Sequence, residues 1–163
     1  MCIRDRITAA ARTNDSDLLQ WLADRPDAMK RVIPSLADLD AVMGKDTAAD
    51  FWLDLVHRNV EPTVTSVAVS RLGQYVYADS QVAKRLVLLL SDPQLGSSAA
   101  LALGDARATD ILIGVLIDSS QQPRARKNAI IGMRGTRDGK TMMRSALAGA
   151  SKSVREEVAA WLK

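Results

Sequence analysis

The sequence predicts an all-α protein built from repeated two-helix units, and three observations carry that prediction. An apolar ladder with side chains at i, i+4 and i+8, the spacing of one helical face, occurs four times. The ladders begin at residues 64, 95, 125 and 154, so they are 31, 30 and 29 residues apart. Proline stands two positions before the first three. Such a period is typical of one supersecondary unit that is reused and buries its apolar face against its neighbours.

The ladder residues are Val64, Ala68 and Leu72, then Leu95, Ala99 and Leu103, then Ala125, Ala129 and Met133, and finally Val154, Val158 and Leu162. Proline marks the start of the first helix in three units. Its missing N–H has no intrahelical acceptor in the first helical turn, so the loss is tolerated there. We therefore expect helices to begin at Pro62, Pro93 and Pro123, with Asp92 as the best side-chain cap. Lys152 stands where the fourth proline would be.

A glycine closes the first helix in three of the units. Gly73 and Gly104 directly follow the last ladder residue, and Gly135 follows two residues after it. We expect a left-handed cap residue at these glycines, because it would turn the chain back into a second helix. Second helices are then expected near 82–90, 108–117 and 139–148.

The N-terminal part of the chain departs from the repeat. Residues 34–60 carry the apolar pairs Phe51-Trp52 and Leu55-Val56 after a capping Thr47, which predicts a divergent repeat. We expect residues 7–33 to form N-terminal capping helices. Residues 1–6, MCIRDR, lie out of phase with the repeats, and we expect them to be an assembly remnant outside the fold. Residues 61–163 hold the regular repeats, and because the last lacks a second helix we expect a fragment of a longer array.

Composition excludes several classes of function. The single Cys2 cannot form an intrachain disulfide, and with the single His57 it leaves no zinc ligand set. We expect no cofactor. The longest apolar run, LVLLL, is far shorter than the roughly 20 residues of a membrane span, so no membrane partner is expected. The cytoplasm is the default location.

Charge is distributed unevenly along the chain. Residues 1–118 hold 12 basic against 16 acidic side chains, a net charge of −4, whereas residues 119–163 hold 10 against 3, a net charge of +7. A basic end of this kind steers acidic partners toward itself.

The stretch DPQLGSSAALALGDARATDILIGVLID at 92–118 resembles the short bacterial HEAT-like repeats first named for phycobilisome lyases. The matching positions are Asp92, Pro93, Ala99, Leu103, Gly104, Asp105, Arg107 and Ala108. The resemblance implies a right-handed, armadillo-like α-solenoid with first helices on the convex side and second helices lining the concave side. It also implies a role as a protein-binding scaffold or adaptor. Residues 135–138 depart from the family's turn pattern, so the last units are expected to be less regular.

Enzymes with this kind of repeat are disfavoured residue by residue. Deoxyhypusine hydroxylases need several His-Glu pairs, and here His57 is followed by Arg58. HEAT-like DNA glycosylases use aromatic and acidic residues in a cationic groove, but Trp52 and Asp54 at i, i+2 face different sides of a helix. An accessory or lyase-type protein stays open as a third hypothesis, since nothing in the sequence singles it out.

The basic C-terminal residues are the only set for which a functional interpretation competes with a solvated surface. They are Arg124, Arg126, Lys127, Arg137, Lys140, Arg144 and Arg155. Asp105 and Arg107 are expected to tie adjacent turns together, and the Met142-Met143 doublet is expected in the core.

We predict a non-enzymatic scaffold that binds an acidic protein or peptide on its concave face. Ile113 and Ile117 would supply apolar contacts. The charged contacts would come from Arg107, Arg137, Lys140 and Arg144. Nucleic-acid backbone binding by the same cations is the second hypothesis, weakened because the sequence places no aromatic residue beside them for stacking.

Overall fold

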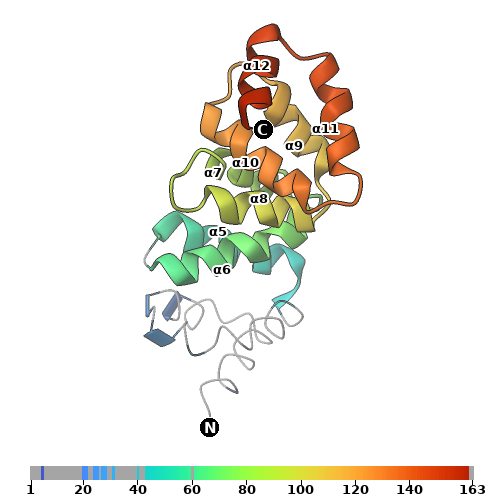
Figure 1. The fold of residues 1–163 in the computed structure, drawn as a ribbon. Coiled ribbons are helices and arrows are strands. Elements are labelled where there is room, and N and C mark those ends of the chain that lie inside the picture. The colour runs from blue at the N-terminus through green and yellow to red at the C-terminus, as the bar shows by residue number, and fades with distance from the viewer. Residues whose placement is uncertain are drawn as a thin grey trace. The chain divides into compact units, whose positions relative to one another are not determined.

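The computed structural model describes residues 43–59 and 61–161, and besides these the single residues 5, 20, 21, 24, 25, 27, 28, 31 and 40. Every regular element in these parts is a helix, which confirms the all-α class (Figure 1). The elements are α5 (Lys45–Arg58), α6 (Pro62–Leu72), η2 (Gly73–Tyr75), α7 (Ser80–Leu89), α8 (Gly96–Asp105), α9 (Thr109–Ile117), α10 (Pro123–Arg134), α11 (Gly139–Ala148) and α12 (Lys152–Trp161). Two compact units divide the chain, Met1–Tyr75 and Val76–Lys163.

The predicted N-terminal segments fall mostly where the structure gives no description. Apart from the single residues named above, the expected remnant at 1–6, the capping helices at 7–33 and the first part of the divergent repeat at 34–60 lie outside the described residues. Within the described part of the chain, none of the helices combines the length and the apolar character needed to cross a bilayer.

In the first unit, α5 packs against α6 through large apolar side chains. Phe51, Trp52, Leu55 and Val56 are all buried. The rings of Phe51 and Trp52 meet edge to face with their centroids 4.9 Å apart. The indole Nε1 of the fully buried Trp52 donates to Asp40 Oδ1 at 2.6 Å, which gives this buried N–H the partner it needs.

The start of α5 differs from the prediction. The helix begins at Lys45, two residues before the predicted cap Thr47, and no side chain caps it. Gly44 precedes it with a φ of 75°, a left-handed conformation that glycine adopts without steric cost. The turn is therefore made by the backbone freedom of Gly44 rather than by a hydroxyl cap.

Two of the three predicted proline starts are confirmed. α6 begins at Pro62 and α10 at Pro123, each with proline in its first turn. Before α6, the carboxylate of Glu61 accepts a hydrogen bond from the backbone N–H of Val64 at 2.9 Å. This bond satisfies one of the free N–H groups at the helix start.

The third proline start, Pro93, is wrong by three residues. Asp92 Oδ1 accepts from the backbone N–H groups of Gln94 at 2.8 Å and Leu95 at 2.9 Å. These bonds fold residues 92–95 into a turn of the kind that aspartate makes with the backbone two residues on. α8 then begins at Gly96.

Burial of the four ladders is confirmed. Each ladder residue that the structure describes is at most 7% exposed, and most are not exposed at all. The fourth ladder is represented by Val154 and Val158, because Leu162 lies outside the described residues. The second helices are confirmed as well, since α7, α9 and α11 match the predicted ranges within two residues at either end.

In the second unit, successive hairpins repeat the same pairwise packing (Figure 1). The first helices pack side by side, α8 against α10 and α10 against α12. The second helices α9 and α11 also pack against each other, and each hairpin packs internally, α8 against α9 and α10 against α11. First helices therefore lie next to first helices, and second helices lie next to second helices.

The α8–α10 crossing brings two backbones into close contact. A Cβ added to Gly104 would lie 2.6 Å from Gly132 O, and a Cβ added to Gly132 would lie 2.5 Å from Ala100 O. Only glycine fits at both positions, because no Cβ approaches a backbone oxygen so closely. The crossing therefore requires a glycine on each helix, at Gly104 and Gly132.

The prediction of left-handed glycines at these three turns is wrong. Gly73 and Gly135 have right-handed φ values of −51° and −75°, and Gly104 lies inside α8. The left-handed residue after α8 is instead Arg107, with a φ of 56°. Gly104 serves helix packing, and the turn is made three residues later by a side chain that carries charge.

Candidate functional site

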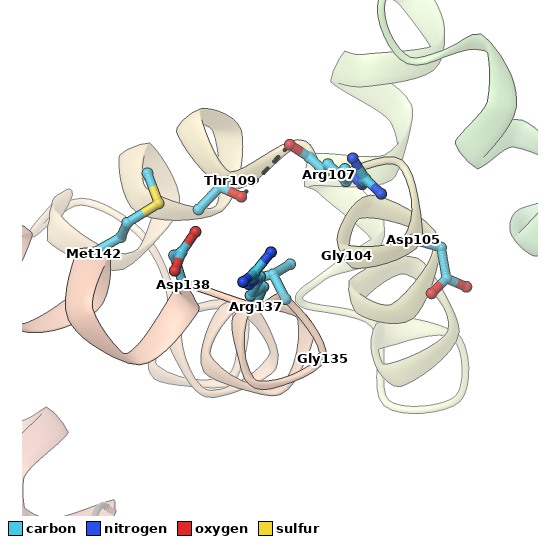
Figure 2. Close-up of a pocket in the computed structure, with 9 residues that line it drawn as sticks. Gly104, Asp105, Arg107, Thr109, Gly135, Arg137, Asp138 and Met142 are labelled. Atoms are coloured by element: carbon cyan, nitrogen blue, oxygen red, sulfur yellow. Dashed lines mark hydrogen bonds between the residues drawn. The ribbon is translucent and has the colours of Figure 1, made fainter.

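A cavity of about 560 Å³ opens where the turn after α8 meets the turn after α10 (Figure 2). We call it the turn cavity. It is lined by Gly104, Asp105, Arg107, Thr109, Gly135, Thr136, Arg137, Asp138 and Met142. Its size falls in the range of roughly 300 to 1,000 Å³ that is typical of ligand pockets. The walls come from equivalent turns of two successive hairpins.

The first turn presents Arg107 in a conformation that glycine normally takes. The N–H of Arg107 donates to Gly104 O and the N–H of Ala108 donates to Leu103 O, both at 2.9 Å. This pair of bonds is a Schellman motif, in which the left-handed residue is usually glycine. A side chain in that conformation costs about 1 kcal/mol. The guanidinium is therefore carried at a position where the backbone alone would favour glycine.

Tyr77 anchors this turn from outside. Its hydroxyl donates to Asp110 Oδ1 at 3.0 Å and lies 3.3 Å from Arg107 O. The N–H of Thr109 also donates to Arg107 O, at 2.8 Å. Desolvation raises the pKa of Tyr77 above its ordinary value, and the hydrogen bond to Asp110 raises it further. The carbonyl of Arg107 is thus fixed while its side chain stays exposed.

Two hydrogen bonds to backbone oxygens hold the second turn. Thr136 Oγ1 donates to Met133 O at 2.9 Å, and Gly139 N donates to Thr136 O at 3.3 Å. A Cβ on Gly139 would overlap Met133 O, so the chain passes too close for any other residue. Arg137 and Asp138 lie between these two anchored points, and both are exposed.

The guanidinium groups of Arg107 and Arg137 have no carboxylate partner: neither forms an ion pair with any residue that the structure describes. In Figure 2 the carboxylate of Asp105 is directed away from them. Two cations in one cavity that form no ion pair with its carboxylates, Asp105 and Asp138, are left to attract an external anion. The planar guanidinium fork matches a carboxylate or phosphate group through paired hydrogen bonds.

Met142 adds an apolar wall to the turn cavity. It is 40% exposed, whereas Met143 is 4% exposed. The prediction that this doublet belongs to the core is therefore confirmed for Met143 and wrong for Met142. A flexible thioether adapts its shape to different apolar groups.

The structure brings two of the six predicted site residues together in one cavity. Arg107 and Arg137 come together in the turn cavity. The other four do not line it. Ile113 is half-buried and Ile117 is 38% exposed, both on α9, whereas Lys140 and Arg144 are exposed on α11.

Two cations of the basic set serve the fold. Arg126 is 5% exposed; it pairs with Glu157 and donates to the backbone oxygens of Asp118, at 3.2 Å, and Gln121. It therefore links α10 to α12. Arg155 donates to two backbone oxygens at and just beyond the end of α11, at 3.3 and 3.0 Å. Neither lines the turn cavity.

Asp118 organises the loop before α10. Its carboxylate accepts from the N–H and hydroxyl of Ser120 at 2.8 and 2.7 Å and from the Gln121 amide at 3.1 Å. These bonds, those from Ser120 foremost, lower the pKa of Asp118, and the charge of Arg126 lowers it further. The loop oxygens that bind Arg126 are held in place by this carboxylate.

Thr109, Thr136 and Asp138 line the turn cavity but were not among the predicted site residues. The signal that would have found them is the repeat itself. Gly104 and Gly135 are 31 residues apart, so the turns that follow them are equivalent and were expected to lie side by side. Only the basic residues of those turns, Arg107 and Arg137, were predicted to be site residues.

Among the described residues, no group of three or more His, Cys, Asp and Glu side chains is placed to hold a metal ion. No protein-family model, curated protein or solved structure matches this chain. The HEAT-like resemblance therefore stays a prediction from the residues.

Proposed function

We propose that this chain is a non-enzymatic scaffold of the HEAT-like α-solenoid type and that it binds an acidic protein segment in the turn cavity. One observation carries the proposal. Arg107 and Arg137 lie in a single cavity, exposed, and form no ion pair with the described part of the chain. Their turns are successive copies of one repeat, and stacked repeats present equivalent side chains in a row along an extended surface.

The chemistry of the cavity fits a peptide that mixes acidic and apolar side chains. Each guanidinium donates charge-assisted hydrogen bonds to a carboxylate of the peptide. Met142 packs against an adjoining apolar side chain. Lys140 and Arg144, exposed on α11, raise the positive potential near the cavity and steer the acidic segment toward it.

The fixed backbone of the first turn favours binding. Tyr77 and Thr109 hold the carbonyl of Arg107, so its backbone loses little freedom when a ligand binds. A binding group that is ordered in advance avoids part of the entropic cost of association.

Selection from a random-peptide display library tests the proposal. We expect wild-type protein to enrich peptides with Asp or Glu close to an apolar residue. The double variant Arg107→Gly, Arg137→Gln should lose that enrichment, because both guanidinium groups are gone while the left-handed turn is kept. Arg134→Gln is the matched control, since Arg134 is exposed at the end of α10 and does not line the cavity. Equal acidic enrichment by the double variant and the control would reject the turn cavity.

Kinetics separate the steering charges from the cavity charges. A selected peptide should associate more slowly with the variant Lys140→Glu, Arg144→Glu, and added salt should reduce the difference. Dissociation should be nearly unchanged, because neither residue lines the cavity. A large increase in the dissociation rate would instead place Lys140 and Arg144 themselves in contact with the bound peptide.

A further inference from the structure

A second cavity, of about 450 Å³, lies over α10 between the start of α8 and the end of α12. We call it the α10 cavity. Its lining includes Asp92, Arg124, Lys127, Asn128, Ile131 and Trp161. None of them lines the turn cavity, so the two sites are separate.

One face of α10 supplies most of the floor. Arg124, Lys127, Asn128 and Ile131 follow the spacing i, i+3, i+4 and i+7, which places them on one side of a helix. Arg124 and Lys127 are exposed, and neither forms an ion pair within the described residues. Two cations one turn apart are thus left to bind an external anion.

The wall opposite contains an aromatic ring. Trp161, half-buried in the last turn of α12, lines the same cavity as Arg124 and Lys127. The expectation that no aromatic residue accompanies the basic set is therefore wrong. Trp161 is far from these cations in the sequence, and the packing of α12 against α10 brings them together.

Asn128 presents a fixed hydrogen-bond acceptor. It is only 8% exposed, and its Nδ2 donates to Leu90 O at 2.8 Å. Because a carbonyl oxygen only accepts, this bond fixes the orientation of the amide. Gly96 leaves room for that amide, since a Cβ there would overlap it. Asn128 Oδ1 has no hydrogen-bond partner among the described residues, so it is an acceptor in the cavity wall.

Asp92 offers a second acceptor. Both of its backbone hydrogen bonds, from Gln94 and Leu95, go to Oδ1. No described residue donates to Oδ2. The α10 cavity therefore combines two cations, one indole ring and two acceptor oxygens.

We propose that the α10 cavity binds a nucleotide unit. The base stacks on Trp161, the phosphate pairs with Arg124 and Lys127, and N–H or hydroxyl donors of the base or sugar reach Asn128 Oδ1 and Asp92 Oδ2. A nucleotide carries an anion, a flat aromatic ring and hydrogen-bond donors together, which matches each group of the cavity. Stacking on an aromatic side chain with cations along the backbone is how proteins hold single strands of nucleic acid.

A thermodynamic cycle that combines one protein substitution with one change in the strand tests whether a base stacks on Trp161. The anisotropy of a fluorescent oligo(dA) is measured with wild-type protein and with Trp161→Ala, and again with a strand of equal length that lacks bases. Trp161→Ala should weaken oligo(dA) binding by about tenfold. The same substitution should leave binding of the abasic strand unchanged. Trp21→Ala is the matched control, because Trp21 is 39% exposed in the other unit. Trp161→Phe keeps a stacking ring, and it replaces Trp161→Ala in this experiment if the alanine variant does not fold.

Salt dependence tests the phosphate contacts. Two contacts predict a slope of log K against log salt of about −1.4, which is roughly a sevenfold loss between 50 and 200 mM salt. The variant Arg124→Gln, Lys127→Gln should remove most of that slope, whereas Arg134→Gln should retain it. Competition by AMP would assign a free nucleotide as the ligand, and its failure would assign the strand; either result supports the site.

Three results would overturn the inference. They are no binding of oligo(dA) or AMP at 50 mM salt, an equal effect of Trp161→Ala on the strands with and without bases, and an equal effect of Arg134→Gln and the double charge variant. The variant Arg107→Gly, Arg137→Gln should bind oligo(dA) normally. Failure at the α10 cavity is therefore distinguishable from failure of the peptide proposal.

Discussion

Helices α10 and α11 come from the same repeat but bury very different surfaces. Along α10 the buried side includes the whole ladder Ala125, Ala129 and Met133, together with Gly132, which meets the backbone of α8. On α11 the only buried residues are Gly139 and Met143. First helices hold the second unit together, whereas the last described second helix is free to expose charge.

This difference shows where the repeat tolerates change. A close backbone crossing leaves no space for an added methyl group, so almost any substitution at the crossing forces the two helices apart. An exposed helix face imposes no such limit, and Lys140 and Arg144 occupy it at no cost in packing. Binding residues are therefore expected on the turns and second helices of this unit.

The largest expected effect is at the crossing. Gly132→Leu should lower the free energy of unfolding by about 3 kcal/mol, because its Cβ alone would lie 2.5 Å from Ala100 O. Urea denaturation followed by circular dichroism measures the loss. Gly114→Ala is the control. Nothing lies within 4 Å of that position on α9, so alanine should raise stability by up to about 1 kcal/mol. A similar loss of stability in both variants would mean that the crossing is no more sensitive to an added side chain than the open position on α9.

The methionine doublet sharpens the comparison within α11. Met143→Ala should destabilise the protein by about 2 to 3 kcal/mol, since it empties a buried site. Met142→Ala should cost no more than about 0.5 kcal/mol, because Met142 is 40% exposed. The same denaturation experiment compares the two, and equal losses would mean that α11 is packed as fully as α10.

A smaller, favourable effect is expected at the turn after α8. Arg107→Gly should raise stability by about 1 kcal/mol, because glycine adopts the φ of 56° without strain. Arg107→Ala keeps the Cβ and should give no such gain. Thermal melting of the two variants measures the difference. If Arg107→Gly lowers the melting temperature instead, the guanidinium contributes to folding and is not held there for binding.

The smallest effect at neutral pH is expected in the first unit, at Tyr75. Burial, followed by the charge of Asp40, raises its pKa from 10.0 to about 12. Folding therefore favours the neutral phenol. Its contribution to stability is complete below pH 10 and is lost as the pH rises toward 12. Urea unfolding at pH 9 and pH 11.5 should show a smaller decrease for Tyr75→Phe than for wild type, and equal decreases would contradict the shift.

The ladders and most helix bounds were predictable because periodicity reports burial directly. Ala68, Ala99 and Ala129 recur at one repeat position, and each is fully buried. Pro62 and Pro123 marked helix starts through their own chemistry, but at Pro93 the neighbouring Asp92 makes a turn first. The local proline rule therefore held at two of the three starts, and at the third a competing local turn delays the helix.

The sequence was least informative where segments distant in the chain meet. The role of Gly104 depends on the backbone of Gly132, which a single sequence does not place. Arg126 and Arg124 look alike in the sequence, yet one is buried against Glu157 and the other lines a cavity with Trp161. The packing between helices decides which distant residue each of these side chains contacts.

Hydrogen exchange of individual amides tests most directly whether the first helices hold the second unit together. Within Val76–Lys163, the central amides of α8 and α10 are predicted to exchange slowest, through global unfolding, and those of α11 at least about tenfold faster through local opening. Amides in α11 that exchange as slowly as those of α10 would contradict this division.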